Sequence, residues 1–289
     1  MESQQPLVSV LMTAYNREQY IAEAIESVLA SSYTNFELII VDDCSSDATV
    51  NIAKTYEAKD QRIKIYVNEK NLGQFPNRNK AASYANGKYL KYLDSDDKIL
   101  NFGLAYCVEE MEKYPEAGLG MYCLYSTDNN KSACWTSERI VREHFFGKLK
   151  LATGPSGIII KRDKFIEIGG FDTRFGVPSD TFFNIKFASQ SPVVLLPVWF
   201  IFYRRHEGQE INNRMDFLKY GHLYFKELLI NIQLPLKENE IQYLYRKMQK
   251  RHSINLVRNF WLTKDLKKTR EVMRDTNFSI TDFIFSFFK

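Results

Sequence analysis

Four short apolar runs alternate with three helical patterns in the first hundred residues, and this alternation restricts the fold more than any other feature. The runs cover 7–14, 36–41, 63–67 and 89–93, and they have the apolar, β-prone composition of buried strands. Apolar residues at helical spacing or helix-capping residues follow at 20–29, 48–58 and 76–85. Strands that alternate with helices form a parallel sheet with right-handed crossovers. The sequence therefore predicts an α/β fold, with a Rossmann-like, mostly parallel sheet flanked by helices.

Local signals place the helix boundaries. Asn16 is predicted to cap the first helix, because Gln19 follows three residues later in the capping-box position. Ser45-Ser46-Asp47 offers cap chemistry for the second helix, and Asn86-Gly87 ends the third.

The fourth run ends in three carboxylates, those of Asp94, Asp96 and Asp97. Unpaired carboxylates packed this closely repel one another, and one of them normally takes up a proton. Carboxylate oxygens are the ligands that Mg²⁺ and Mn²⁺ prefer, and Mg²⁺ usually binds through one or two carboxylates plus substrate phosphates. We interpret the stretch as a metal–diphosphate site; the alternative is a solvated acidic turn.

Polar residues follow three of the predicted strands at the point where each strand ends. Ligands of parallel sheets bind beyond these carboxyl ends, so the groups are expected to share one site. The sequence has no G-x-G-x-x-G and no P-loop motif, which leaves a metal at Asp94 and Asp96 to neutralise a diphosphate. The three polar segments are Thr13-Ala14-Tyr15-Asn16, Asp42-Asp43 and Asp94-Ser95-Asp96-Asp97.

Composition limits the class of protein. The chain has 289 residues, enough for one large domain or two small ones, and it is 45% hydrophobic with a net charge of +4, which does not favour a nucleic-acid partner. Cys44, Cys107, Cys123 and Cys134 lack zinc or disulfide spacing, so free thiols in a reducing compartment are expected. The polar N-terminus lacks a signal-peptide pattern, and no apolar run reaches the length of a membrane helix. We expect a cytoplasmic protein.

Several segments together resemble family 2 glycosyltransferases of the GT-A fold. The resemblance covers the first hundred residues closely and reappears between about 153 and 206. It implies an inverting transferase that uses a nucleotide-diphosphate sugar, expected to be a UDP-sugar, and a divalent metal, Mn²⁺ or Mg²⁺. The segments that carry it are Val8–Asn16, Ile39–Asp47, Asn71-Leu72-Gly73, Arg78-Asn79 and Leu93–Asp97.

The resemblance also implies roles for single residues. Thr13 and Tyr15 would line the nucleoside pocket, and Asp43 would hydrogen-bond the base, most often uracil. Asp96 would be the most direct metal ligand. Asp94 would lie near the ribose and the metal, and His206 would close over the diphosphate and join the metal ligands; the alternative for Arg204-Arg205-His206 is a surface basic cluster. The whole implied nucleotide-sugar site is Thr13, Ala14, Tyr15, Asn16, Asp42, Asp43, Gly73, Arg78, Asp94, Ser95, Asp96 and His206.

A second segment is similar to the part of the family that carries the catalytic base. Gly169-Gly170-Phe171-Asp172 precedes Ser179-Asp180, where the family usually has Glu-Asp. The resemblance implies that Asp180 is the general base, because the acceptor hydroxyl must lose its proton as it attacks the sugar. The alternative is that Asp180 caps the helix that follows.

The rest of the chain carries fewer signals. Residues 126–150 are expected to be irregular and to face the acceptor, and the chain is expected to divide into a catalytic domain, 1–207, and a C-terminal helical extension, 208–289. The aromatic stretch 278–289 follows a segment rich in Lys and Arg. It could dock on the fold, form a homodimer contact or lie on the inner surface of a membrane.

We therefore expect a metal-dependent glycosyltransferase that moves one sugar per encounter to a hydroxyl of a saccharide or lipid-linked acceptor, in surface polysaccharide biosynthesis. The alternatives are an inactive nucleotide-sugar-binding module and a sugar nucleotidyltransferase. The latter normally has a Gly-rich loop after its first strand, and 13–17 contains no glycine. A phosphatase of the haloacid dehalogenase type carries its D-x-D motif after the first strand instead of the fourth.

Overall fold

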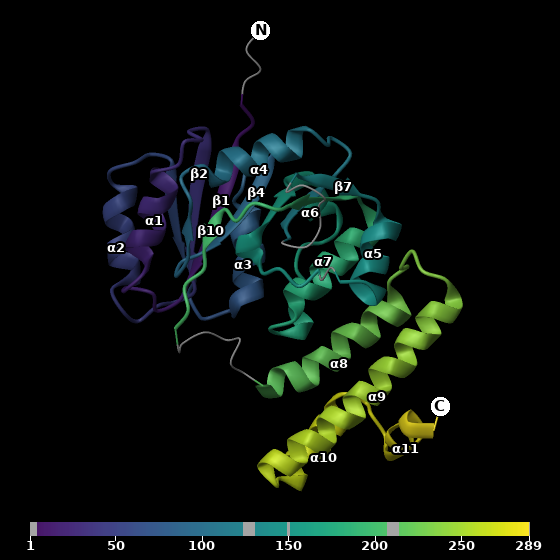
Figure 1. Cartoon of the computed structure of the whole chain (residues 1–289). Coiled ribbons are helices and arrows are strands. Elements are labelled where there is room, and N and C mark those ends of the chain that lie inside the picture. Colours follow the sequence, from purple (N-terminus) through teal and green to yellow (C-terminus); the bar gives the residue numbers. More distant parts are fainter. Residues whose placement is uncertain (1–4, 124–130, 149–150, 207–213, 289) are drawn as a thin grey trace.

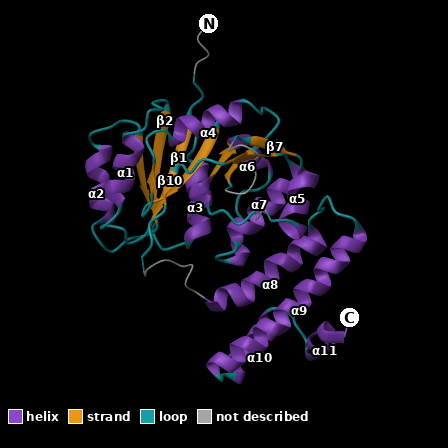
Figure 2. Ribbon diagram, in the orientation of Figure 1, coloured by secondary structure: helices purple, strands orange, loops and turns teal. Residues whose placement is uncertain are grey.

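The computed structural model describes residues 5–123, 131–148, 151–206 and 214–288, and its centre is one eight-stranded sheet with helices on both faces (Figures 1 and 2). The four predicted strands are confirmed and lie side by side in the order β3-β2-β1-β4, all parallel. The buried, mostly apolar runs of β1, β2 and β4 are typical of central parallel strands, whereas β3 lies at the edge of the sheet and is only partly buried. The four strands are β1 (Val8–Ala14), β2 (Phe36–Asp42), β3 (Ile63–Val67) and β4 (Tyr89–Asp94).

The second half of the sheet is mixed. It continues from β4 in the order β8-β6-β9-β7, where β8 and β7 run antiparallel to their neighbours and β6 pairs with β9 in parallel. A separate two-stranded ribbon pairs β5 (Lys98–Ile99) with β10 (Ile201–Phe202), which brings the segment before His206 next to the acidic turn. The strands of the second half are β6 (Leu119–Tyr122), β7 (Ala133–Trp135), β8 (Ile158–Lys161) and β9 (Val193–Leu196).

Two hydrophobic cores lie on opposite faces of the sheet, because side chains alternate along each strand. In β1, Val10 and Met12 belong to one core and Leu11 to the other. Helices α1 (Ile21–Leu29), α2 (Thr49–Glu57) and α4 (Gly103–Glu112) cover the Val10 face. The Leu11 face is covered by α3 (Gln74–Ser83), α5 (Ser137–Phe146), α6 (Arg162–Glu167) and α7 (Ser179–Gln190).

The predicted cap of the first helix is wrong. Helix α1 starts at Ile21 with Tyr20 as its N-cap. Asn16 instead has a φ of 51°, and its side-chain Oδ1 accepts a hydrogen bond from the backbone N–H of Ser46 at 2.9 Å. Asn16 tolerates this left-handed conformation, and its side chain ties the loop after β1 to the loop after β2.

The prediction of an irregular 126–150 is also wrong for its described part. Residues 131–148 hold β7 and α5, and the side chain of Thr136 caps α5 by accepting from the backbone N–H of Arg139. Helix α5 buries Ile140, Val141 and Phe145 in the core on the Leu11 face, next to α7. Residues 124–130 and 149–150 lie outside the described residues.

The C-terminal helices pack on α7 and its neighbouring segments at one end and extend away from the sheet at the other (Figure 1). Leu228 of α8 and Met248 of α9 belong to the core on the Leu11 face, and α8 contacts α7 and the 3-10 helix η3 (Thr173–Phe175). Among the described residues, no helix combines the length and apolar character needed to cross a bilayer. The division at 207 falls outside the described residues and stays a prediction. The helices are α8 (Arg214–Asn231), α9 (Glu238–Thr263), α10 (Leu266–Asp275) and α11 (Ile280–Phe288).

Substitution of Gly87, with Gly221 as the control, tests how closely the chain packs beside β1. A methyl group at Gly87 would lie 2.6 Å from the backbone nitrogen of Ser9 and 2.8 Å from the carbonyl oxygen of Leu7, both in or next to β1. We expect Gly87→Ala to reduce the free energy of unfolding by about 1–3 kcal/mol, because the backbone must move. Urea unfolding measures it. The control is Gly221→Ala in α8, where no described atom lies within 4 Å; it should be neutral or stabilising by about 0.5 kcal/mol. Equal midpoints for the two variants would contradict this packing.

Candidate active site

The end of β4 places three carboxylates in one small volume. The carboxylate oxygens of Asp94, Asp96 and Asp97 lie within 4.8 Å of one another, and Asp97 is only 1% exposed. The parallel register sets Asp94 opposite Thr13 of β1. The acidic group therefore lies at the carboxyl edge of the sheet, where the sequence predicts a ligand site.

Cationic and imidazole side chains surround two of these carboxylates. Arg78 Nη1 is 2.7 Å from Asp94 Oδ1 and donates to Thr13 Oγ1 at 3.0 Å. Asp96 Oδ2 contacts Arg17 Nε at 3.1 Å and His206 Nε2 at 2.9 Å. These contacts hold the two carboxylates in place at the end of β4. Arg17 is a site residue that the sequence analysis missed.

The third carboxylate has a different environment. Burial and the neighbouring charge of Asp94 raise the pKa of Asp97 to about 7, while its Oδ1 accepts a hydrogen bond from the Arg204 backbone N–H at 3.0 Å. Added positive charge would favour the ionised form of Asp97. Buried oxygen donors in this number suit Mg²⁺ or Mn²⁺. The residues present thus fit a divalent ion, with Asp97 as a member absent from the predicted ligand set.

The segment 204–206 packs on the acidic turn. Arg204 Nε donates to the Asp96 carbonyl oxygen at 3.0 Å, and its Nη2 is 3.0 Å from Glu23 Oε2. The imidazole of His206 stacks on the Tyr20 ring with 5.0 Å between centroids. Arg204 and His206 are therefore tied to the site, and the alternative of a surface basic cluster is wrong for these two residues.

Asp43 is almost fully buried beside the predicted nucleoside pocket. Its Oδ1 accepts from Asn68 Nδ2 and from the Leu72 backbone N–H, both at 2.8 Å, and its Oδ2 accepts from the Gly73 N–H at 2.9 Å. Gly73 has a φ of 88° and precedes α3, a conformation that favours glycine. A carboxylate offers about four acceptor sites, so Asp43 retains capacity for one further donor.

The remaining predicted residues lie at or next to the carboxyl ends of β1, β2 and β4. Asp42 is buried, and its two oxygens accept from the Ser45 N–H at 2.8 Å and the Ser45 hydroxyl at 2.5 Å. The carbonyl oxygen of Ala14 accepts from the Asp43 N–H at 2.8 Å, and Ser95 Oγ donates to the Thr13 carbonyl oxygen at 2.8 Å. These residues set the backbone of the edge. The side chain of Tyr15, in contrast, is exposed.

Asp180 lies in the first turn of α7, where it interacts electrostatically with both Arg78 and Asp94. Pro178 is the N-cap of this helix, so the alternative role of Asp180 as the cap is wrong. Its Oδ1 accepts from the Thr181 N–H at 2.5 Å and the Thr181 hydroxyl at 3.1 Å. Burial raises the pKa of Asp180 to about 6, against the lowering effect of the Thr181 hydrogen bonds and of Arg78. Such a carboxylate is ionised at neutral pH and is more basic than an exposed one.

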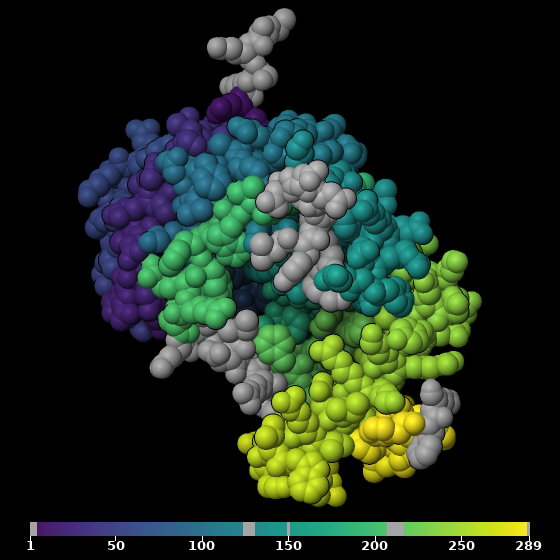
Figure 3. Space-filling model, viewed as in Figure 1, coloured from purple at the N-terminus to yellow at the C-terminus, as the bar shows by residue number. Residues whose placement is uncertain are grey.

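The molecular surface is hollowed between the green segment that leads to His206 and the teal part of the chain (Figure 3). A methyl group at Gly154, which precedes η2 (Pro155–Gly157), would lie 3.9 Å from Asp180 Oδ2, so this glycine borders the carboxylate. The Ser156 hydroxyl of η2 accepts from the Asp94 N–H at 3.0 Å, which links Asp180's surroundings to the acidic group.

Comparison with known proteins identifies the family. The model of "Glycosyl transferase family 2" matches residues 9–169, more than half of the chain. A relative in Bacillus subtilis, the "Putative teichuronic acid biosynthesis glycosyltransferase TuaG", is 40% identical over 126 residues, 44% of this chain and 47% of the relative. The Escherichia coli "UDP-Glc:alpha-D-GlcNAc-diphosphoundecaprenol beta-1,3-glucosyltransferase WfgD" is 46% identical over 91 residues, 32% of this chain and 35% of the relative. The chain spans about half or less of the length of these curated relatives.

Solved structures confirm the fold. Residues 1–349 of S. aureus TarS in complex with UDP-GlcNAc superpose with a TM-score of 0.72 at 22% identity, covering 96% of this chain and 81% of TarS 1–349. The mannosyltransferase PcManGT from Pyrobaculum calidifontis, in complex with GDP-Man and Mn²⁺, superposes with a TM-score of 0.66 at 15% identity. The superposition covers 99% of this chain and 84% of PcManGT. The GT-A-like architecture with C-terminal helices is thus shared with structures of glycosyltransferases.

The buried cation of Arg78 should contribute more to the stability of the protein than an exposed cation does. Its side chain is 7% exposed and faces Asp94. We expect Arg78→Met to reduce the free energy of unfolding by about 2–4 kcal/mol, because it leaves a partly buried carboxylate without its partner. The control, Lys164→Ala, removes an exposed pair with Glu167 and should leave the urea midpoint nearly unchanged. Urea midpoints measure both, and equal losses would contradict the role assigned to Arg78.

Proposed function

The chain belongs to glycosyltransferase family 2, and on that premise we propose that it transfers a sugar from a nucleotide-diphosphate sugar to an acceptor hydroxyl. One observation carries the proposal: Arg78 pairs with Asp94 of the acidic group at 2.7 Å and also interacts electrostatically with the more basic carboxylate of Asp180. The proposed donor site and the proposed base for the acceptor therefore share one cation. An inverting transfer needs both groups at one anomeric carbon.

We propose a UDP-sugar as the donor. TarS binds UDP-GlcNAc and the name of WfgD specifies UDP-Glc, whereas PcManGT binds GDP-Man. The remaining acceptor capacity of Asp43 suits the single ring N–H of uracil. Thr13, Tyr15 and Asn16 at the rim would complete the nucleoside pocket.

A divalent ion, Mn²⁺ or Mg²⁺, would be held by Asp96 with Asp94, Asp97 or His206. Such an ion offsets the charge that builds on the leaving diphosphate. Arg78 and Arg17 place two further positive charges within 3.1 Å of these carboxylates. They would strengthen binding of an anionic donor without a glycine-rich phosphate loop.

Asp180 is the proposed general base. The acceptor oxygen forms a bond to the anomeric carbon as its proton passes to the Asp180 carboxylate. On the opposite face the bond from the anomeric carbon to the diphosphate oxygen breaks, and the electron pair leaves with the diphosphate. Configuration inverts because attack and departure occur on opposite faces. The bonds from Thr181 orient the carboxylate for this step.

We propose that the acceptor is a saccharide or lipid-linked saccharide in surface polysaccharide biosynthesis. TuaG is named for teichuronic acid biosynthesis, and WfgD is named for a diphosphoundecaprenol-linked acceptor. These names support the class of acceptor, while the sugar and the linkage are open to a screen of UDP-sugars with lipid-linked and free saccharides.

Substitution of Asp180 tests whether this residue acts in the transfer step or in binding of the donor. We expect Asp180→Asn to lower kcat by about 10²–10⁴-fold with little change in UDP affinity, because the amide cannot accept the proton at the attacking oxygen. The control is Asp163→Asn on the exposed side of α6, which should leave both unchanged. An Asp180→Asn variant with full turnover would rule out this base. Loss of UDP binding as well would assign Asp180 to the donor site.

The raised pKa of Asp180 predicts how kcat/KM depends on pH. Below a pKa of about 6 Asp180 is protonated, so kcat/KM should fall tenfold per pH unit on the acid side and level off above pH 7. Steady-state rates between pH 5 and 8 measure this. Asp180→Asn should lose the acid limb, and a profile that keeps the limb in that variant would contradict the assignment.

A further inference from the structure

Positive charge is concentrated in the C-terminal helices. Residues 246–275 contain ten Lys or Arg and three Asp or Glu, a net charge of +7, whereas the whole chain carries +4. The rest of the chain is therefore net negative. The ten basic side chains are all exposed: Arg246, Lys247, Lys250, Arg251, Arg258, Lys264, Lys267, Lys268, Arg270 and Arg274.

Large apolar side chains are exposed among these cations. Trp261 is 65% exposed, Leu262 68% and Leu266 50%, all at the junction of α9 and α10. Lys264 Nζ lies 3.9 Å from the centroid of the Trp261 ring. The following helix α11 adds Ile280, which is 71% exposed. A surface that mixes exposed indole, aliphatic and ammonium groups is costly in water and matches the headgroup region of a bilayer.

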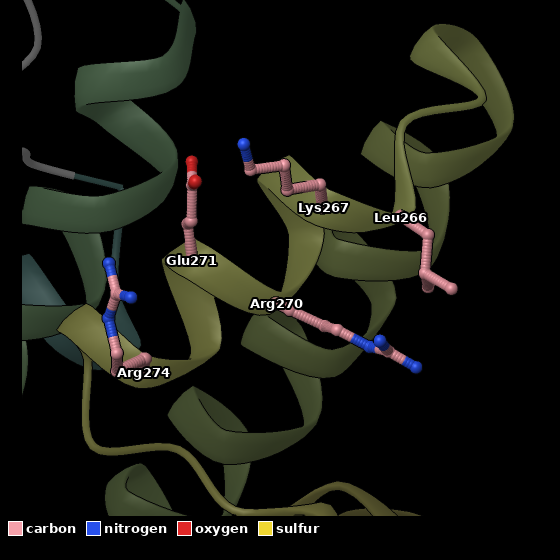
Figure 4. Close-up of a pocket in the computed structure, with 5 residues that line it drawn as sticks. All are labelled: Leu266, Lys267, Arg270, Glu271 and Arg274. Carbon is pink, nitrogen blue, oxygen red and sulfur yellow. The ribbon is translucent and has the colours of Figure 1, made fainter.

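Three of the cations lie together on α10. Lys267, Arg270 and Arg274 extend from this helix and, with Leu266 and Glu271, line a hollow (Figure 4). A groove between α9 and α11 repeats the combination, since Arg246, Lys250, Phe285 and Phe287 line it. We name the exposed residues of 246–274 and α11 the basic-aromatic surface.

We propose that the basic-aromatic surface binds an anionic lipid bilayer. The cations would lie against acidic headgroups, and Trp261, Leu262 and Leu266 would enter the interface. A homodimer through this surface would set one net charge of +7 against another, which opposes association. A nucleic acid would use the charge but would leave the exposed leucines in water.

Membrane binding would also place the acidic group on the side of the molecule that faces the bilayer. Helices α8 to α10 lie beyond the edge where the parallel strands end, the same edge that carries the acidic group (Figure 1). A bilayer on the basic-aromatic surface would therefore lie on the side of the molecule that carries the acidic group. The proposal goes beyond the proposed function, and its test uses no nucleotide, so each can fail without the other.

Flotation of the full chain with vesicles tests the proposal. We expect binding to phosphatidylglycerol–phosphatidylcholine vesicles and little binding to phosphatidylcholine alone, with affinity that falls as salt is added. Lys267→Gln/Arg270→Gln/Arg274→Gln should weaken binding roughly 100-fold, at roughly fivefold for each cation near an anionic surface. The matched control is Lys54→Gln/Lys59→Gln/Lys64→Gln, which removes three exposed cations from the region of α2 and β3.

A second variant tests insertion without a change of charge. Trp261→Ser/Leu262→Ser should weaken vesicle binding at least tenfold, and tryptophan emission should shift to the blue on vesicles in the wild type but not in Trp261→Phe. Equal losses in the two triple-Gln variants would overturn the proposal. It would also be overturned if anionic vesicles did not bind while light scattering showed a dimer, or if the surface bound duplex nucleic acid instead.

Discussion

Electrostatic repulsion among Asp94, Asp96 and Asp97 is the constraint on which the rest of the site depends. Carboxylates within 4.8 Å of one another in a buried turn must find positive partners or take up protons. The structure supplies those partners from distant parts of the chain: Arg17 after β1, Arg78 in α3 and the segment 204–206 after β10. The acidic turn thus brings three distant segments of the chain to one point.

The sheet makes this convergence possible. Parallel pairing of β1 with β2 and β4 aligns Ala14 with Asp42 and Thr13 with Asp94, so three polar segments end at the same level. Apolar side chains on both faces of these strands leave the carboxyl edge as the place where polar groups can meet solvent. The site therefore follows from the burial of the strands.

Much of this was predictable from sequence, and the errors have physical causes. Apolar runs predict the four parallel strands, and their ends predict the acidic edge. Asn16 was wrongly assigned as a cap because a capping box is a local pattern, whereas its partner Ser46 is thirty residues away. Arg17 was missed for the same reason, since its contact with Asp96 depends on tertiary structure. The Thr136 cap and the apolar spacing of α5 were signals that could have been read.

The central claim is that the acidic group binds a divalent ion together with a nucleotide diphosphate. Calorimetry of UDP binding with and without Mn²⁺, on the wild type and on Asp96→Ala, tests it most directly. The account predicts micromolar binding that requires both the metal and Asp96. If no nucleotide diphosphate, including GDP, bound in a metal-dependent manner, the donor site assigned to this edge would be contradicted.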